Sequence, residues 1–459
     1  MINSKKIIAL GMVALALVLG FVTNITNVEA AEVIAEDVEE ETIEENTEDI
    51  VEISDEDSDD EIEMEAEEDD TTVDLDDEND GANTIEGPIV VGTDADSITD
   101  AIDMASEVGG GKIIVPAGCY SEQLFIETDN ITIEAEAGAI LDGTGIKPTD
   151  DANAMIYIQA SGVSVSKLEI RNFKYEGPSE SITTTGIEVA DGSSNVTIKD
   201  CKIHDIGCIY TTVSEDYNGH GIYVSGTVKN PTTAINIEGC ELYNLNLGQS
   251  ESLALNGNVS NFTVNNNYIH NCDNIGIDAI GYEQTKEDSE NRELDRAREG
   301  VIINNKVEYI SCDPDVNITY NSKCAAGIYV DGGDHVIIFG NTVSYCDIGI
   351  EVATEHPGVA VTAIYVHDNI LRENNAFAGI AFGGYDPEKT GWATGCAFED
   401  NYIYNTSGTC FIVQYACSGT NAIYHNTFDA QDSAVEYKES FGEKSAGNVV
   451  VKNIYSNKE

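Results

Sequence analysis

An internal repeat constrains the fold of this chain more than any other feature. A unit of the form apolar-x-apolar-x-x-Asn-x-apolar recurs at spacings of 25 to 39 residues, with Cys201 and Cys240 in the asparagine position of two early units. Self-similarity at such a period is typical of solenoids and propellers, in which each repeat is one structural unit. The asparagines of the repeat are Asn267, Asn305, Asn341, Asn369, Asn401, Asn426 and Asn453.

A second unit, Gly-apolar-x-apolar, alternates with the first. Together they predict short strands joined by turns, and stacking of the coils brings equivalent residues into columns about 4.8 Å apart. A buried asparagine at each turn can bond the coils above and below, which satisfies polar groups that are costly to bury. We therefore predict a parallel β-helix of about ten or eleven coils, an all-β solenoid. The second unit starts at Gly186, Gly221, Gly276, Gly327, Gly349 and Gly379.

Residues 97–108 predict one short helix before the strands begin. Ser97 can cap its N-terminus, and the glycines at 109–111 end it. This helix would close the N-terminal end of the solenoid. A leucine-rich horseshoe is excluded because the leucine framework is missing. The apolar face of the helix consists of Ile98, Ala101, Ile102 and Ala105.

Residues 1–30 read as a secretory signal peptide. Lys5 and Lys6 precede an uncharged apolar run at 7–22, and small residues follow where cleavage near Ala30 or Ala31 is expected. A single membrane anchor is the alternative, although the apolar run is short for a span. We expect a secreted, extracellular product.

Residues 31–87 form an acidic linker that we expect to be disordered. The stretch 32–80 holds 28 acidic residues and no Lys or Arg, so it cannot bury enough apolar surface to offset the entropy of ordering. A spacer or pro-segment is the simpler interpretation, and a cation-binding or interaction tail is the alternative. The β-helix domain then spans residues 88–459.

The net charge of −62 excludes whole classes of partner. Binding to nucleic acid or to anionic lipid needs clustered cations, so we expect no nucleic acid and no stable membrane insertion after signal cleavage. Acidic polymers are disfavoured unless calcium bridges them or the loop from Arg292 to Arg298 receives them, which ranks neutral glycans first. The eleven cysteines contain no CxxC pair, so a zinc site is poorly supported, and their disulfide state stays open.

Residues 88–459 resemble the pectate-lyase-like superfamily of right-handed parallel β-helix proteins. The helix at 97–108, the glycine run, residues 113–120 and the asparagine column carry this resemblance. It implies a right-handed parallel β-helix, but the fold hosts lyases, hydrolases, epimerases and adhesins. Further blocks resemble secreted bacterial right-handed β-helix repeat proteins; they lie at 250–253, 256–259, 274–283, 327–333, 348–356 and 383–386.

Carboxylates concentrate on the outward positions of three successive coils. Asp278, Asp331 and Glu351 are the candidate catalytic acid and base or nucleophile, with Glu355 and His356 beside them. Neighbouring coils would place carboxylates about 5 Å apart and alternate coils about 10 Å apart, which brackets the separations used by glycosidases. Crowding also raises the pKa of one carboxyl group, as a general acid requires. The alternative is a solvated acidic face.

The same side of the solenoid carries candidate substrate-binding residues. Arg298, in an insertion at 281–300 that can form a short helix, could bind a substrate carboxylate or pair with Asp278 or Glu283, or simply form ion pairs within the loop. Trp392, the only tryptophan, could stack on a sugar ring or anchor its loop. The full set is Tyr282, Glu283, Arg298, Tyr329, Tyr385, Asp386, Trp392 and Gln414.

Three functions remain open. The leading one is a glycoside hydrolase that degrades an extracellular polysaccharide or glycan with paired carboxylates. The second is a calcium-dependent polysaccharide lyase, in which the acids hold calcium and Arg298 or Lys306 is the base. The third is a monomeric, non-catalytic glycan-binding or surface protein. The triplet Gly219-His220-Gly221 resembles one block of polygalacturonases, but the other blocks are absent in the required order. We predict no certain cofactor other than this possible calcium, and a monomer.

Overall fold

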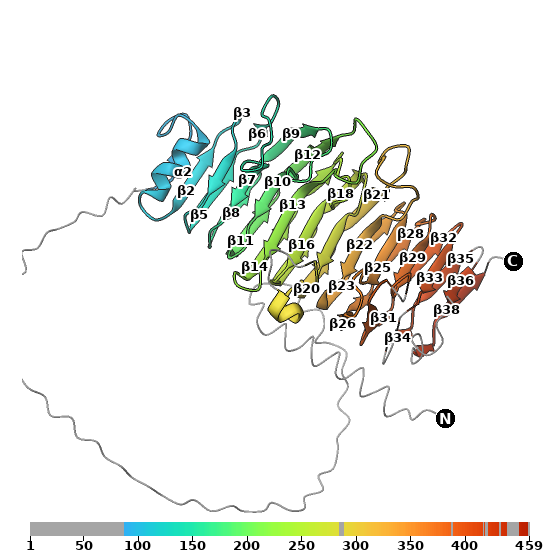
Figure 1. Cartoon of the computed structure of the whole chain (residues 1–459). Helices are drawn as coiled ribbons and strands as arrows, with labels where there is room; N and C mark the ends of the chain where they lie inside the picture. Colours follow the sequence, from blue (N-terminus) through green and yellow to red (C-terminus); the bar gives the residue numbers. More distant parts are fainter. Residues whose placement is uncertain are drawn as a thin grey trace, which may run out of the picture. The chain divides into compact units, whose positions relative to one another are not determined.

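The computed structural model describes residues 87–283, 289–386, 389–415, 417, 421–430, 433–437 and 449–457. In this part of the chain, three parallel sheets run side by side along one axis (Figure 1). We call them sheets A, B and C, in the order in which the chain passes through them in each coil. The signal peptide predicted at 1–30 and the linker predicted at 31–87 lie, up to residue 86, outside the described residues.

Sheet A has 15 strands among the described residues. They are β1 (Ile89–Val90), β2 (Gly111–Val115), β5 (Ile131–Ala135), β8 (Ser164–Ser166), β11 (Ser194–Lys199), β14 (Thr232–Glu238), β17 (Val259–Asn265), β20 (Arg298–Ile303), β23 (Asp334–Phe339), β26 (Ala360–Thr362), β27 (Tyr365–His367), β30 (Trp392–Thr394), β31 (Ala397–Glu399), β34 (Ala422–Tyr424) and β37 (Val449–Val451).

Sheet B has 12 strands within the same described ranges. They are β3 (Gly118–Tyr120), β6 (Ala139–Asp142), β9 (Glu169–Glu176), β12 (Lys202–Ile209), β15 (Glu241–Tyr243), β18 (Tyr268–Cys272), β21 (Lys306–Ile310), β24 (Thr342–Ser344), β28 (Ile370–Arg372), β32 (Tyr402–Asn405), β35 (Thr427–Ala430) and β38 (Ile454–Asn457).

Sheet C has 11 strands in the described part of the chain. They are β4 (Leu124–Ile126), β7 (Ala154–Ile158), β10 (Thr184–Val189), β13 (Gly219–Gly226), β16 (Leu253–Gly257), β19 (Ile277–Ile280), β22 (Ala326–Asp331), β25 (Ile348–Ala353), β29 (Ala378–Phe382), β33 (Thr409–Val413) and β36 (Ser433–Tyr437).

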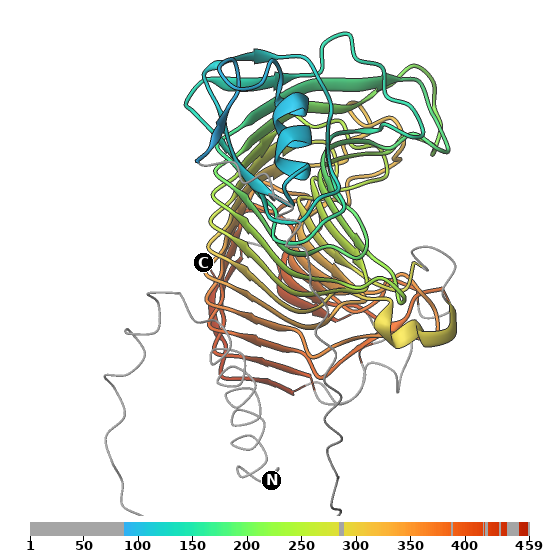
Figure 2. The same cartoon turned by 90° about the vertical axis from the view of Figure 1, so that its left-hand side faces the viewer.

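Each coil contributes one strand to each sheet, so equivalent strands of successive coils pair in parallel. Along each strand, alternate residues point inward, and together they fill a continuous core of Ile, Val, Leu and Phe side chains. Figure 2 looks along the axis from the N-terminal end and shows the strands stacked into flat walls joined by turns. The predicted fold is confirmed: the chain forms a right-handed parallel β-helix. Sheets B and C hold 12 and 11 strands in the described residues, at or slightly above the ten or eleven coils predicted.

The predicted asparagine ladder is present at the turn between sheets A and B. The side-chain oxygen of Asn305 accepts from the backbone N–H of Asn267 at 2.9 Å and from its amide at 3.0 Å. The same pair of bonds joins each later asparagine of the column to the next, as far as Asn453. Cys240 begins the ladder with its backbone N–H on Asn267, and its own side chain is buried, as the repeat predicts.

Helix α2 (Ile98–Ser106) closes the N-terminal end of the solenoid. The side chain of Ser97 accepts from the backbone N–H of Asp100 at 3.0 Å, which confirms the predicted cap. The glycine run follows the helix. Residue 110 has to be glycine because its φ is +124° and a Cβ there would meet the carbonyl of Asp129 at 2.6 Å. The predicted apolar face is buried against the first coils; it comprises Ile98, Ala101, Ile102 and Ala105.

The cysteines are free thiols in the structure, and nine of the eleven are buried. Most therefore act as small apolar core residues, and no metal-ligand spacing groups them. Among the described residues, no helix is long and apolar enough to cross a membrane.

Candidate functional site

Sheet C aligns the outward residues into the columns that the repeat predicts. Strand pairing places one residue of each of eight successive coils in the first column. Asp331 lies two residues beyond Tyr329, in the next outward column, where it pairs with Ala353. The first column reads Glu188, Tyr223, Ala254, Asp278, Tyr329, Glu351, Ala381 and Ile412.

The three central acids are not solvated. Asp278 is 3% exposed and Asp331 is 6% exposed, while Glu351 is partly buried. A second apolar cluster packs on this outer face of sheet C around Tyr329, Ile348 and Ala381, with Phe377 against it. The alternative of a solvated acidic face is therefore wrong for these coils, because the outer side of the sheet is itself covered.

Burial and mutual repulsion raise the pKa values of all three acids. Burial is the largest cause in each case. The next cause is the charge of Glu251 for Asp278 and the charge of Glu355 for Asp331 and Glu351. The pKa of Glu351 rises to about 8. Coupled carboxyl groups of this kind cannot all ionise at neutral pH, so part of the cluster keeps a proton, as a general acid requires.

Hydrogen bonding distinguishes the two buried aspartates. The Oδ1 atom of Asp278 is buried without a hydrogen-bond partner. The Oδ1 atom of Asp331 accepts from the backbone N–H of Glu355 at 3.0 Å. A donor aimed at a carboxylate favours its ionised form, and a carboxyl oxygen without a donor favours the protonated form. The cluster therefore contains one acid suited to hold a proton and one suited to lose it.

The separation of the acids differs from the prediction. Asp278 and Glu351 share a column, but Tyr329 stands between them, so their Cα atoms are two strand spacings or about 10 Å apart. Asp331 lies diagonally from both, at about 8 Å by strand spacing and rise. The expected contact of about 5 Å between acids of neighbouring coils is absent among these three, because the intervening coil places a tyrosine in the shared column.

Sequence reasoning missed one side of the cluster. Glu251 precedes β16, and burial followed by the charge of Glu283 raises its pKa well above the usual value. His220 lies beside it, with Nδ1 at 3.0 Å from the carbonyl oxygen of Glu251. Burial lowers the pKa of His220 to about 4, so the neutral ring donates to this carbonyl. Asn256 donates from Nδ2 to Glu283 Oε2 at 2.8 Å.

Two exposed glutamates stand at the edge of the cluster. Glu283 and Glu355 are both exposed, and Glu283 acts on the pKa of Glu251, Asp278, Asp331 and Glu355. The side chain of Glu355 is open on one side, but the surrounding protein still desolvates its carboxyl group; this effect, followed by the charge of Glu283, raises the pKa of Glu355. The predicted neighbour His356 is partly buried, and burial lowers its pKa. These residues mark the side from which solvent reaches the buried acids.

Tyr282 and Arg298 were predicted to bind substrate, and the structure gives them other roles. Tyr282 is 2% exposed, its hydroxyl donates to the carbonyl of Ala360 at 3.2 Å, and the guanidinium of Arg296 bonds the same hydroxyl. Arg298 donates to Asn258 Oδ1 at 2.7 Å instead of pairing with Asp278 or Glu283. The insertion, which includes the 3₁₀ helix η2 (Ser289–Leu294), thus packs Tyr282 against a later coil and Arg298 against an earlier one. The burial of Tyr282 contradicts its predicted contact with substrate, whereas substrate binding by Arg298 stays a prediction.

The remaining predicted substrate-binding residues divide by exposure. Tyr385 is 59% exposed and Trp392 is 38% exposed, but Trp392 lies on β30 of sheet A. Asp386 forms an ion pair with Lys389 at 3.3 Å. Tyr329 and Gln414 are 6% and 4% exposed, so the structure buries them within the outer face of sheet C.

The acids do not form a calcium site. In the described part of the chain, the only group of three potential ligands within 4.8 Å of one another is Glu399, Asp400 and His425. Asp278, Asp331 and Glu351 do not meet that distance, so these three side chains do not gather around one ion as the lyase hypothesis requires. Lys306, one of the two predicted lyase bases, pairs with Glu308 on sheet B at 2.7 Å.

The comparison with known sequences decides the family. The chain is 35% identical over 359 residues to the uncharacterized protein YwoF of Bacillus subtilis (strain 168), an alignment that covers 75% of this chain and 73% of that protein. This chain belongs to the YwoF family. No protein-family model matches it.

Solved structures share the fold of this YwoF-family chain. The GH136 lacto-N-biosidase from Eubacterium ramulus superposes with a TM-score of 0.50 and 13% identity, over 79% of this chain and 64% of that structure. The catalytic domain of a GH87 α-1,3-glucanase in complex with tetrasaccharides gives a TM-score of 0.50 and 13% identity, over 80% and 69%. The present chain thus spans slightly less than two thirds of the biosidase. At these identities the likeness shows the β-helix fold alone.

In this member of the YwoF family, the cluster on sheet C can move protons. Several coupled carboxyl groups within two columns cannot all ionise near neutral pH, so some keep a proton while others lose it. The pair Asp331 and Glu351 combines a carboxylate that accepts a backbone N–H with a carboxyl group of pKa about 8. Such a pair can donate one proton and accept another in the same reaction.

Proposed function

We propose that this protein is an exported glycoside hydrolase that cleaves a neutral polysaccharide with inversion at the anomeric carbon. The observation that carries the proposal is the cluster of buried, mutually repelling acids on three successive coils of sheet C. The two solved proteins of this fold with the TM-score of 0.50 are named as a lacto-N-biosidase and an α-1,3-glucanase, which supports a glycan as substrate.

The roles follow from the environment of each acid. Glu351, with a pKa of about 8, is protonated at neutral pH and would donate its proton to the glycosidic oxygen. Asp331 receives the backbone N–H of Glu355 and would act as the general base on water. Their Cα atoms lie about 8 Å apart by strand spacing and rise, a span that can place the carboxyl groups at the separation of about 6.5–9.5 Å found in inverting enzymes, with room for that water. Asp278, protonated, would add a hydrogen-bond donor to the same site.

Neutral glycans are the preferred substrate class because of the charge of the site. The pKa values of Asp278, Asp331 and Glu351 respond mainly to burial and to other carboxylates. A polyanion brought to this surface would be repelled unless cations screened it. Arg296 and Arg298 of the 281–300 insertion bond Tyr282 and Asn258, so they do not offset this charge.

The test is a panel of polysaccharides incubated with the full chain, with reducing ends as the readout. We expect Asp331→Asn and Glu351→Gln each to lower turnover at least about 10²-fold, while Asp368→Asn, on an exposed aspartate, leaves it unchanged. Nuclear magnetic resonance of the first product should show the inverted anomer. Full turnover in both cluster variants would contradict the assignment. Products that absorb in the near ultraviolet, with loss of activity in chelator, would indicate the lyase instead.

A further inference from the structure

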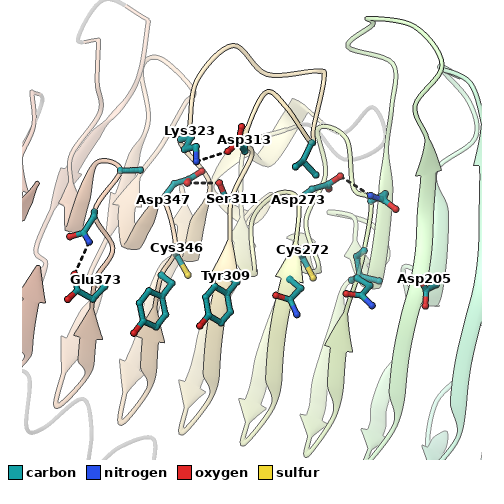
Figure 3. Close-up of a pocket in the computed structure, with 18 of the residues that line it drawn as sticks. Asp205, Cys272, Asp273, Tyr309, Ser311, Asp313, Lys323, Cys346, Asp347 and Glu373 are labelled. Carbon is teal, nitrogen blue, oxygen red and sulfur yellow. Dashed lines mark hydrogen bonds and ion pairs between the residues drawn. The ribbon is translucent and has the colours of Figure 1, made fainter. Parts of the chain in front are cut away.

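A second candidate site lies on sheet B, away from the acid cluster of sheet C. A groove of about 680 Å³ crosses the turns between sheets B and C. The loop at 311–325 carries Asp313, Val316 and Lys323 to one wall, and Figure 3 shows Asp313 and Lys323 above the strands that bear Tyr309 and Glu373. None of the acids of the cluster on sheet C lines it. A volume of this size suits a small or chain-like ligand better than a folded protein.

The floor of the groove is a single column of residues with positive φ. Each residue directly follows a registered position of sheet B, so the six lie one per coil along about 24 Å of the axis. Their φ angles lie between 54° and 59°, so each coil has a left-handed residue at the same place in sheet B. The six residues are Asp205, Asn244, Asn271, Tyr309, Tyr345 and Glu373.

The residue types in this column show which positions the turn alone explains and which need another reason. Asparagine and aspartate tolerate the left-handed conformation, so Asp205, Asn244 and Asn271 are explained by the turn itself. Tyrosine has no such preference, and a bulky residue at positive φ is strained. Tyr309 and Tyr345 nevertheless occupy this conformation on successive coils. Such backbone strain is more common at functional sites, so two successive tyrosines in this conformation suggest that their side chains have a function.

The two tyrosines form an exposed aromatic surface. Their ring centroids are 5.0 Å apart and their planes differ by 5°. Tyr309 is 51% exposed and Tyr345 is 49% exposed, although both border the groove. Parallel tyrosine rings with open faces and hydroxyl groups suit the apolar faces and hydroxyls of sugar rings.

Five acids and two lysines line the groove, so its charge is net negative. Lys323 pairs with Asp313 at 2.6 Å, and Lys174 donates to Asn246 Oδ1 at 2.9 Å. The two buried aspartates of the wall, Asp273 and Asp347, accept hydrogen bonds from neighbouring backbone and side chains. A neutral ligand therefore fits this groove better than a polyanion, since no cluster of unpaired cations lines it in the described structure.

We propose that this groove is a non-catalytic binding site for a linear neutral glycan, which runs along the solenoid axis over Tyr309 and Tyr345. The asparagine amides of the column would bond sugar hydroxyls at intervals of one coil. The site holds polymer on sheet B while the separate cluster acts on sheet C. The proposal does not depend on the hydrolase activity, because binding can be measured in the Glu351→Gln variant.

The experiment is affinity gel electrophoresis of the full chain in gels that contain hydroxyethylcellulose, laminarin, galactomannan or polygalacturonate. We expect at least one neutral polymer to retard the wild type and the Glu351→Gln variant equally. The double variant Tyr309→Ala/Tyr345→Ala should bind that polymer at least tenfold more weakly. Tyr402→Ala, on an exposed tyrosine of sheet B outside the groove, is the matched control and should bind as the wild type does.

Each other outcome overturns the proposal. It fails if no neutral polymer retards the wild type, if only polygalacturonate does, or if the double variant is retarded as strongly as the wild type. Thermal unfolding of the double variant, compared with Tyr402→Ala, verifies that weaker binding does not reflect loss of the fold. Loss of hydrolysis in Glu351→Gln with retention of binding would support both proposals, and retention of binding without hydrolysis in the wild type would remove only the first.

Discussion

Buried aspartates occur in two regions of this β-helix, and their surroundings are opposite. At the turns between sheets B and C, Asp347 accepts from Ser311 Oγ at 2.7 Å and from the backbone N–H groups of Cys312 and Ala325 at 3.0 and 3.2 Å. On the outer face of sheet C, Asp278 keeps one carboxyl oxygen without any partner. Both side chains are 3% exposed.

The contrast shows that burial alone does not identify a functional acid. A carboxylate surrounded by donors holds its turn together, and removing it leaves buried N–H groups without a partner. A buried carboxyl group that keeps one oxygen without a donor and faces other acids makes the fold less stable, so its presence points to a role in chemistry. Asp273 belongs with Asp347, because it accepts from Leu247 and Tyr210, both at 2.6 Å.

The largest expected effect is a difference in the free energy of unfolding between variants of Asp347 and Asp278. Asp347→Ala should lower the free energy of unfolding by about 3 kcal/mol, because two backbone donors lose their acceptor. Asp278→Asn should leave the stability unchanged or raise it, because it removes a buried group that repels its neighbours. Urea unfolding of both variants beside the wild type measures the difference. Equal destabilisation would show that the contrast has no energetic basis.

A somewhat smaller loss is expected in the asparagine ladder. Asn341→Ala removes the acceptor for the backbone N–H of Asn305 and a donor to the carbonyl of Ile302. We expect about 2 kcal/mol of destabilisation in the same urea assay. Asn236→Ala, on an outward position of β14, is the control and should change stability by less than about 0.5 kcal/mol. A ladder variant as stable as the control would indicate that its hydrogen bonds contribute little.

The pH dependence of hydrolysis tests the acids of sheet C directly. Activity should fall as pH rises through about 8, because Glu351 then loses the proton that it donates. The charge of Glu355 is the largest neighbouring influence that raises this pKa, so Glu355→Gln should move the alkaline limb to lower pH by less than about one unit. Rates across pH 5 to 10 measure the limb. A shift to higher pH in Glu355→Gln would contradict the assignment of Glu351 as the acid.

The smallest effect concerns the two sheets acting together. If sheet B holds polymer while sheet C cleaves it, Tyr309→Ala/Tyr345→Ala should raise KM for a long polysaccharide about threefold to tenfold. Its kcat, and its kinetics on a short oligosaccharide, should stay unchanged. Tyr402→Ala again serves as the control. A fall in kcat on the short substrate would instead connect the groove to the chemistry.

The columns of sheet C were predictable because stacked coils force equivalent repeat positions into register. The repeat thus identified the Asp278–Tyr329–Glu351 column correctly without any contact information. His220 and Glu251 were missed as site residues because they lie outside the repeat unit: His220 is within β13 but before the glycine that starts the unit, and Glu251 precedes β16. The burial of Tyr282 depends on how the 281–300 insertion packs against Ala360 of a later coil, and no local pattern records such a contact.

The groove on sheet B had no sequence signal either. Its floor is formed by one left-handed residue from each coil of sheet B, and the asparagine, tyrosine and glutamate side chains there share a backbone conformation but no chemical pattern. Only the register of the neighbouring strands shows that Tyr309 and Tyr345 lie side by side. Periodicity therefore predicts which residues share a face of a strand, whereas turns and insertions require the structure.

The helix at the N-terminal end has a consequence for self-association. A solenoid ends in strands whose backbone N–H and C=O groups could pair with another chain, and a flat exposed end would promote fibrous stacking. Helix α2 contacts β1, β2, β4 and β5 and buries its apolar face over the first coils. Helix α2 therefore covers the N-terminal end of the solenoid and hinders the pairing of its edge strands with another chain.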